Sequence, residues 1–274
     1  MAALSLEPLF LQAGKTPIGL QLWSIREDMK KDPLGVLKQV ATIGFQEVEG
    51  GSSYEKGKFY GIVPTKFKQE LHALGLKMTS GHYSIDEATL KSQTVSDVLK
   101  LAVDSAKEVG NKYFIQPYVD VSKRNLDDYK RLFDAMNVVG AHCQSNGLQF
   151  AYHNHDFEFQ KIEDKTIYQM ILESTDPKLV KMQMDLYWVY FAKQNPYDWF
   201  KKYPNRFDLF HMKDLANSEK RETTEIGDGT IDFKSIIDHV GKKKKFIVEL
   251  EHYKTTPLLG VEKSYQNLRK LIKK

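Results

Sequence analysis

Two histidines close an apolar run in the stretch FAYHNHDFEFQ, residues 150 to 160. His153 and His155 are separated by Asn154, and alternate residues of a β-strand point to the same side. If the run is a strand, both imidazoles face one way at its end. Imidazole is a common metal ligand, and with an ordinary pKa near 6.5 it also carries protons at neutral pH. The stretch therefore predicts a metal ligand, a proton carrier or both.

Three more residues of metal-binding type follow at regular intervals. Asp185, His211 and Glu251 each close a later apolar run, and the four residues from His153 onward are separated by 32, 26 and 40 positions. These are close to the roughly 30 residues of one strand–helix–strand unit. Two imidazoles and two carboxylates suit Mn, Zn, Co or Fe, and Mg less well. Any one of them alone could be a hydrogen-bonded structural residue, but the set in register predicts a divalent-metal site.

Eight apolar runs alternate with helical patterns and would position these residues. The expected strands are 18–23, 45–49, 76–82, 112–118, 148–153, 180–185, 207–213 and 245–251. Helical spacing is clearest at 32–44, 64–75, 86–110 (which divides into two helices) and 125–147. Asp32 is an expected N-cap, and four helices are expected to end at a glycine: Gly44, Gly75, Gly110 and Gly147.

Strands separated by helices indicate parallel βαβ units, and eight of them form a (β/α)8 TIM barrel of about 250 residues. The rival fold is a doubly wound open sheet. That fold usually has a glycine-rich phosphate loop after its first strand, and LQLWSIRED at 20–28 does not resemble one. The sequence predicts one barrel domain at 16–274, preceded by an extension at 1–15.

Active sites of such barrels lie at the C-terminal ends of the strands. The polar and aromatic residues expected there are more numerous than core packing would explain, since buried polar groups without partners are costly. They are Gln21, Trp23, Arg26, Glu47, Glu49, His82, His153, His155, Asp185, His211, Lys213, Glu249 and Glu251.

Composition argues against several classes of protein. A net charge of +4 is a weak basic excess, which does not favour a nucleic-acid partner. The single cysteine, Cys143, excludes an internal disulfide and is expected in a helix as a core residue. No apolar run reaches the roughly 20 residues needed to span a membrane. Residues 1–15 could be an export-signal remnant, which would indicate the periplasm, or a loose extension of a cytoplasmic protein.

Several motifs resemble one known superfamily across nearly the whole chain. They are GFQEVEG at 44–50, MDLYW at 184–188, HMKD at 211–214, IGDGTIDF at 226–233 and the closing VELEHY. Together they resemble the xylose-isomerase-like sugar isomerase and epimerase barrels, which include inosose dehydratases and the endonuclease IV group. The resemblance implies that Asp185, His211 and Glu251 hold a divalent metal.

Two departures from that pattern bear on the reaction. His153 stands where the superfamily has a strand-5 glutamate, so proton exchange between two carboxylates is in doubt. The motif YHNH resembles instead the Y-H-x-H of inosose-dehydratase-like and 3-keto-glycoside-cleaving members. In addition, Glu249 and Glu251 both face inward if the last strand alternates regularly. We expect Glu251 on the metal and Glu249 one layer deeper.

The remaining rim residues receive expected roles. His155 is the expected proton carrier, with Lys213 stabilising an enediolate and Glu251 as a second candidate base. The alternatives are a loop-capping role for His155 and a salt bridge to Asp214 or Glu49 for Lys213. Trp188 could equally be helix-packing core. The expected substrate contacts are Gln21, Trp23, Glu49, His82, Trp188 and Glu249.

The expected function is proton abstraction next to a metal-bound carbonyl of a keto-sugar or cyclitol, giving isomerisation or epimerisation. Elimination, as inosose dehydration or 3-keto-glycoside cleavage, is the alternative. A DNA-repair endonuclease and a non-catalytic sugar-binding barrel are less favoured. We expect a small, neutral sugar as partner, without nucleic acid or membrane, and a homo-oligomer is compatible with the sequence.

Overall fold

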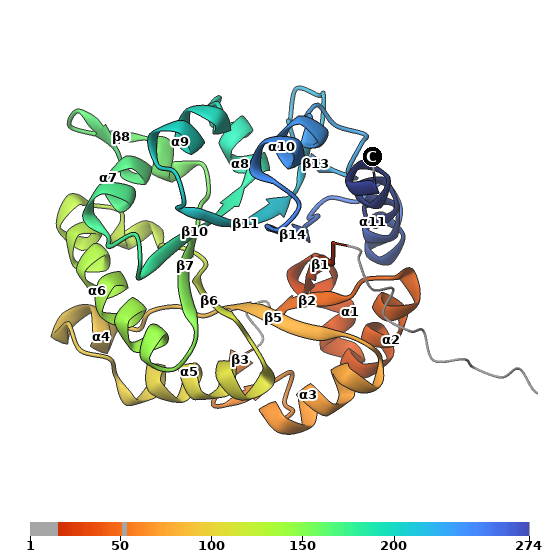
Figure 1. Cartoon of the computed structure of the whole chain (residues 1–274), viewed down its shortest axis with the longest axis horizontal. Helices are drawn as coiled ribbons and strands as arrows, with labels where there is room; N and C mark the ends of the chain where they lie inside the picture. Colours follow the sequence, from red (N-terminus) through yellow and green to blue (C-terminus); the bar gives the residue numbers. More distant parts are fainter. Residues whose placement is uncertain (1–15, 51–53, 274) are drawn as a thin grey trace, which may run out of the picture.

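The computed structural model describes residues 16–50 and 54–273, and its centre is a closed barrel of eight parallel strands (Figure 1). Each strand pairs with the next barrel strand along the chain, and the last closes on the first. This confirms the predicted (β/α)8 fold. The barrel strands are β1 Ile18–Gln21, β2 Glu47–Gly50, β5 Lys77–His82, β6 Tyr113–Gln116, β7 Gln149–His153, β10 Val180–Asp185, β11 Phe207–Met212 and β14 Lys245–Val248.

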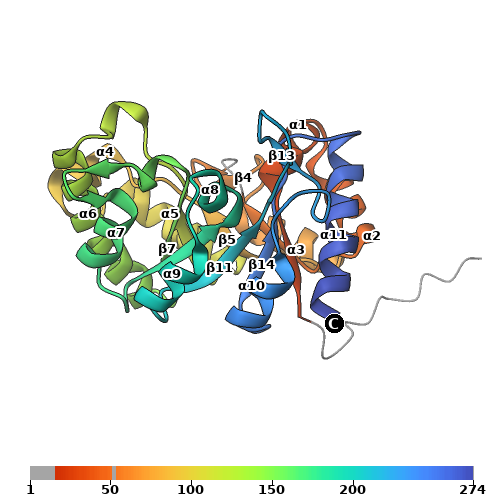
Figure 2. The ribbon, with the colours of Figure 1, turned by 90° about the horizontal axis from the view of Figure 1, so that it is seen from above.

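Helices surround the barrel, as two perpendicular views show (Figures 1 and 2). They are α1 Arg26–Lys31, α2 Pro33–Ile43, α3 Pro64–Ala73, α4 Glu87–Ser92, α5 Asp97–Val109, α6 Leu126–Ser145, α7 Ile167–Ser174, α8 Leu186–Phe191, α9 Pro196–Lys202, α10 Phe233–Val240 and α11 Pro257–Lys273. Short 3₁₀ turns (η1 Leu22–Ile25, η2 Val121–Lys123, η3 Phe157–Phe159) and three small hairpins lie in the connections. The hairpins are β3 Tyr54–Glu55 with β4 Lys58–Phe59, β8 Lys161–Ile162 with β9 Lys165–Thr166, and β12 Asp214–Leu215 with β13 Thr223–Thr224.

The helix boundaries follow the local signals in the sequence. Asp32 caps α2 by accepting a hydrogen bond from the Gly35 amide at 3.0 Å. Segment 86–110 forms two helices, α4 and α5, as predicted. Gly44 and Gly110 end their helices with φ near +110°, a conformation that is costly for residues with a Cβ.

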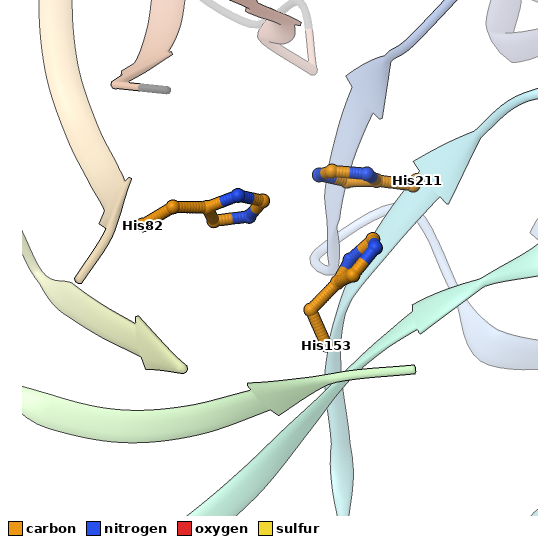
Figure 3. A group of neighbouring side chains, drawn as sticks. All are labelled: His82, His153 and His211. Atoms are coloured by element: carbon orange, nitrogen blue, oxygen red, sulfur yellow. The ribbon is translucent and has the colours of Figure 1, made fainter. Parts of the chain in front are cut away.

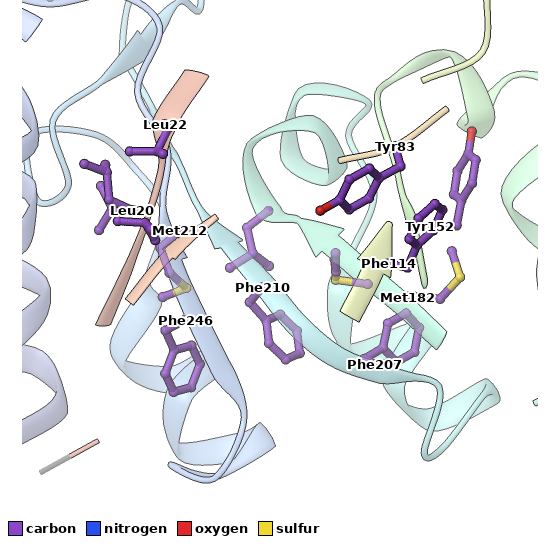
Figure 4. Close-up of a cluster of buried hydrophobic side chains, with 14 of the residues drawn as sticks. Leu20, Leu22, Tyr83, Phe114, Tyr152, Met182, Phe207, Phe210, Met212 and Phe246 are labelled. Carbon is purple, nitrogen blue, oxygen red and sulfur yellow. The ribbon is translucent and has the colours of Figure 1, made fainter. Parts of the chain in front are cut away.

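Strand alternation sorts the side chains into an outer core and a barrel interior. Phe114, Phe210, Phe246 and their neighbours point outward against the helices (Figure 4). Inside, the middle of the barrel is filled by a small apolar layer of Ile115, Ala151, Leu209 and Ile247. Cys143 is buried on α6, as expected. The inward positions above the apolar layer are polar, and they form the site described below.

Several strands end earlier than predicted. β1 ends at Gln21 and β14 at Val248, so Trp23, Glu249 and Glu251 lie in the turns and loops beyond the strands. The expected extension at 1–15 lies outside the described residues. No helix in the part of the chain that the structure describes is long and apolar enough to cross a membrane.

Candidate metal and substrate site

Four ionisable side chains from consecutive barrel units meet at the C-terminal mouth of the barrel. His153 ends β7, Asp185 ends β10, His211 lies in β11, and Glu249 follows β14. One donor atom from each lies within 4.8 Å of those of the others, and all four residues are buried. The end of β10 is fixed locally, because Asp185 also caps α8 by accepting from the Trp188 amide at 3.2 Å.

The hydrogen bonds of the His153 and His211 rings define which nitrogen of each ring faces the cluster. His211 places Nδ1 2.8 Å from Glu249 Oε2, while its Nε2 lies 2.6 Å from Glu49 Oε1. His153 places Nδ1 3.0 Å from Gln183 Oε1, and its Nε2 faces Asp185 Oδ2 at 3.8 Å. Metal-binding histidines commonly donate their other ring N–H to a carboxylate or carbonyl oxygen. Both rings have this arrangement.

The cluster's own electrostatics fit a cation. Asp185 Oδ2 is buried without a hydrogen-bond partner, which is uncommon for a carboxylate oxygen. Burial raises the pKa of Asp185 above its usual range. Burial also lowers the pKa of His211, but Glu249 and Glu49 more than offset this and raise it to about 10. The His211 ring lies between two carboxylates that favour its protonated form, so positive charge is stabilised at this place. The donor set therefore could hold a divalent ion.

A second group of possible ligands shares two of these rings. His82, His153 and His211 point toward one another from β5, β7 and β11 (Figure 3). His82 Nε2 is already 3.0 Å from Gln183 Oε1 and 3.2 Å from Glu49 Oε1. In contrast, His153 Nε2 and His211 Nδ1, which face Asp185 and Glu249, have no hydrogen bond to Gln183 or Glu49. The group with two carboxylates is therefore the better candidate.

The structure corrects the expected order of the two glutamates after β14. Glu249, and not Glu251, joins His153, Asp185 and His211. The alternation that placed Glu251 on the cluster does not extend past Val248, where β14 ends. Beyond it the chain is held by hydrogen bonds from Leu250 N to Ser24 Oγ and from Glu251 N to Thr223 Oγ1. The Glu251 side chain is 31% exposed and lies at the cavity wall.

Lys213 connects the two glutamates to Asp185. Its buried ammonium forms an ion pair with Glu251 and lies 3.3 Å from Glu249 and 3.6 Å from Asp185. Burial lowers its pKa, but the three carboxylates outweigh this and hold the pKa of Lys213 above its ordinary value. The ion pairs considered from the sequence, to Asp214 or Glu49, are not the ones observed. Lys213 is thus a fixed positive charge beside the cluster.

His155 lies on the loop after β7 and lines the same cavity. Its ring is 5.0 Å from that of His153 and packs against Tyr118, Phe157 and Trp188. Nδ1 is buried and has no partner, so this nitrogen does not cap the loop. Burial and the charge of Lys213 lower the pKa of His155 to about 3. The ring is therefore neutral at physiological pH. An unperturbed imidazole would make the reaction rate change between pH 6 and 7, and we do not expect this change from His155.

The expected substrate contacts divide into two layers. Trp23, His82, Trp188 and Glu249 line a cavity of about 700 Å³. The indole Nε1 of Trp188 is buried and unpartnered, so it is a free donor there.

Gln21 and Glu49, the other two expected substrate contacts, are not among the residues that line the cavity. Glu49 is fully buried and accepts hydrogen bonds from Gln21 at 2.7 Å, Ser80 at 2.6 Å and Gln183 at 2.7 Å, besides its contact with His211. It supports the rings from beneath. Of these partners, Gln183 was missed in the sequence, although it shares the inward face of β10 with Asp185.

Glu158 was also missed. Its buried carboxylate accepts from Tyr152 Oη at 2.6 Å and from the His155 amide at 2.8 Å, and it thereby fixes the loop that carries His155. Nothing in the local spacing indicates this contact, because Tyr152 points outward from the barrel and the loop folds back over it.

The glycine-rich segment 226–233 forms a tight turn around Asp214. The Asp214 carboxylate accepts from the amides of Gly227, Gly229 and Ile231 at 2.9 to 3.2 Å. Asp232 then caps α10, as predicted. The backbone amides that a phosphate loop would offer are therefore bonded to a carboxylate.

Comparison with known proteins agrees with the fold. The chain is 24% identical to an inosose dehydratase from Salmonella agona, over 96% of this chain and 97% of that protein. A crystal structure of a sugar phosphate isomerase/epimerase from Parabacteroides distasonis has a TM-score of 0.80 and 28% identity, covering 97% of this chain and 98% of that one. The structure of the IOLI protein with a binding zinc atom has a TM-score of 0.73 at 11% identity, covering 93% and 98%, which shows a shared fold.

The family model described as xylose isomerase-like TIM barrel matches residues 37–273. This match agrees with the resemblance of the sequence motifs and with the closed eight-stranded barrel. The chain belongs to the xylose isomerase-like TIM barrel family.

Proposed function

We propose that this protein is a divalent-metal-dependent enzyme that removes a proton next to the carbonyl of a keto-sugar or cyclitol. The observation that carries the proposal is the meeting of His153, Asp185, His211 and Glu249 beside a cavity, with Asp185 Oδ2 buried and unpartnered. A divalent ion there would supply Lewis acidity to a carbonyl and its neighbouring hydroxyl. The ligand set, one ion per chain and the roles below are parts of this proposal.

The chain's own residues would bind and orient the substrate and move the proton. His155 is proposed as the proton carrier, because its neutral ring presents a buried, unpartnered nitrogen at the cavity. Lys213 is a fixed positive charge that stabilises negative charge developing on substrate oxygen. Glu251 is not part of the proposed ligand set. It lies at the cavity wall and is a second candidate base. Trp188 Nε1 and His82 are proposed to bind hydroxyl groups.

Two outcomes can follow proton removal. Reprotonation gives isomerisation or epimerisation, which the family name and the sugar phosphate isomerase/epimerase neighbour favour. Loss of a group from the next carbon gives dehydration or glycoside cleavage. Elimination is favoured by His153, which occupies the place of a second carboxylate base, and by the similarity to inosose dehydratases. Both outcomes share the same first step.

Other classes of function fit the site less well. A DNA-repair endonuclease would need a basic surface, and the small net charge of +4 does not support one. A non-catalytic sugar-binding barrel would not need a group of buried ligands with an unpartnered oxygen. We propose a neutral small-molecule substrate, whose turnover depends little on salt.

The test is solvent exchange at the carbon next to the carbonyl. The protein loaded with Mn or Zn is incubated in D₂O with keto-sugars, 3-keto-glycosides and inososes, and deuterium uptake is followed by NMR. We expect uptake that disappears on chelation and returns with added metal. Uptake that persists in fully metal-free protein would contradict the proposal, and tight, salt-sensitive binding to abasic DNA would favour the nuclease class instead.

A further inference from the structure

The cavity at the barrel mouth has two halves with different chemistry. The inner half is lined by two members of the metal-site group, His153 and Glu249, together with Lys213, Glu251 and His155. The outer half continues over the ends of β5 and β6 to the first turns of α5, where its lining is mainly apolar. Its walls include Tyr54, Val98, Leu99, Ala102, Pro117 and Tyr118. A volume of about 700 Å³ lies in the range that encloses drug-sized ligands, so one sugar ring fills only part of it.

Three exposed apolar side chains line the cavity. Val98 is 71% exposed, Tyr118 44% and Trp23 37%. In the described part of the chain eight large apolar residues are exposed, and these three line this one cavity. Single exposed apolar residues are ordinary, but a group of them around a cavity indicates a binding surface.

Positive charge for a phosphate group is missing from the described lining. Its two cations are Lys213, which already faces three carboxylates, and Lys56, which pairs with Glu55 at 3.5 Å and has an 88% exposed side chain. Asp86 and Glu251 add negative charge to the wall. Phosphate is usually bound by arginine, by unpaired lysine or by free amides at a helix N-terminus.

The helix N-termini beside the cavity already carry side-chain caps. Asp86 caps α4 by accepting from the Thr89 amide at 2.8 Å, and Ser96 caps α5 by accepting from the Leu99 amide at 3.1 Å. These caps use amides that would otherwise be available to an anion. The outer half therefore suits an uncharged group.

We infer that the outer half is a subsite for an uncharged apolar or aromatic substituent on the sugar ring, and that the substrate carries no phosphate. The inference rests on the proposed function for the identity of the ring in the inner half, and on the cavity alone for the substituent. It assigns Val98 and Tyr118 as specificity-determining residues. They contact the substituent and take no part in moving the proton.

Binding of three matched ligands tests the subsite. Methyl 3-keto-β-glucoside, its phenyl analogue and the methyl compound with a 6-phosphate are titrated calorimetrically into the metal-loaded protein. Burial of an aromatic group of this size predicts about 10–100-fold tighter binding of the phenyl ligand. The phosphorylated ligand is expected to bind more weakly than its neutral parent.

A pair of variants locates the effect. Val98→Glu is expected to remove most of the preference for the phenyl ligand and to leave the affinity for the methyl ligand within about twofold, because residue 98 is exposed and lies outside the metal group. Leu259→Glu is the matched control, since Leu259 is 54% exposed on α11 and does not line the cavity. It should change neither affinity.

The subsite is overturned if phenyl and methyl ligands bind equally, if the 6-phosphate binds more tightly than its parent, or if none of the three binds. Its failure is distinguishable from that of the proposed reaction. Preferential binding of the phenyl ligand without deuterium uptake would keep the subsite and reject the reaction. Deuterium uptake at equal rates and affinities for both glycosides would keep the reaction and reject the subsite.

Discussion

Buried polar groups lie at both ends of this barrel, and the two places differ in how completely the protein provides them with hydrogen-bond partners. At the N-terminal end, just before β11, Arg206 donates through Nη1 to Leu172 O at 2.6 Å, through Nη2 to Thr175 Oγ1 at 2.7 Å and through Nε to Val180 O at 3.2 Å. At the C-terminal mouth, Asp185 Oδ2, His155 Nδ1 and Trp188 Nε1 are buried without hydrogen-bond partners.

The difference separates polar groups that stabilise the fold from polar groups that are available to a ligand. Buried polar atoms in folded proteins nearly always have partners. Three of the six exceptions among the described residues lie at the barrel mouth, which indicates a metal or substrate that completes them. A guanidinium whose three nitrogens all donate to the protein contributes to stability instead. This agrees with the division of labour in TIM barrels, whose active sites lie at the C-terminal ends of the strands. Mutations at the two ends should therefore have different consequences.

The largest effect is expected for Asp185→Ala. Metal affinity should fall by more than the roughly 10–100-fold seen when a group that only orients a ligand is removed. The protein should remain folded, with a loss of about 1 kcal/mol from the α8 cap. Metal analysis after dialysis measures the first effect and thermal unfolding the second. Asp97→Ala is the control, because the Asp97 side chain is 97% exposed. Full metal occupancy in the Asp185 variant would contradict the ligand assignment.

Arg206→Met should give the opposite result. Three acceptors lose their donor, which costs about 3 kcal/mol or more of unfolding free energy. Metal content and deuterium exchange should be unchanged at temperatures where the variant is folded. Chemical denaturation measures the loss of stability, and metal analysis of the same sample measures the metal content. Loss of metal from this variant would break the proposed separation of the two ends.

His155→Ala tests chemistry at the mouth apart from metal binding. The variant should keep its metal and lose on the order of 10²-fold in exchange rate, the usual scale of general acid–base catalysis. His153→Ala, in contrast, should lose the metal. Unchanged exchange in His155→Ala would leave Glu251, the second candidate base, as the proton carrier.

Gln183→Leu examines the layer beneath the cluster. Gln183 Oε1 accepts from His153 and His82, each at 3.0 Å, and its amide donates to Glu49 at 2.7 Å. Without it the His153 ring loses its orientation, and metal affinity should fall by about 10–100-fold. Competition with a chelator measures the change. An unchanged affinity would show that packing alone orients the ring.

The smallest effect concerns the pH dependence of stability through Glu158. Burial raises the pKa of its carboxyl group to about 7, against an unfolded value near 4.5. Folding favours the protonated form, so the stabilisation is fully present below about pH 4.5 and is lost as the pH rises through 7. Glu158→Gln should flatten the change in unfolding free energy over this range, on the order of 2 kcal/mol. Urea unfolding at pH 5 and pH 7 measures this change in unfolding free energy. An equal change in the variant and the unmodified protein would contradict the prediction.

The fold could be read from the sequence because its signals are local. Helix ends at Gly44, Gly110 and Asp32 follow from backbone conformation and capping, and apolar runs between them identify the strands. The alternation of side chains is reliable inside a strand, so His153, Asp185 and His211 were placed together correctly. These three residues all lie within β7, β10 and β11.

Beyond the strands the same argument fails. The expected positions of Glu249 and Glu251 were the reverse of those observed, because β14 ends at Val248. The loop after it is positioned by hydrogen bonds to Ser24 and Thr223, which are distant in the sequence. Glu158 was missed for the same reason, since its partners are brought together by the tertiary fold. Gln183 could have been found, because it shares the inward face of β10 with Asp185.

The most direct test of the account is the position of a metal in crystals soaked with Zn or Mn, measured by anomalous scattering. We expect one strong peak per chain, at roughly 2.0–2.2 Å from His153 Nε2, His211 Nδ1 and carboxylate oxygens of Asp185 and Glu249. A peak held by His82, His153 and His211 without the carboxylates, or no peak at the barrel mouth, would contradict the central claim.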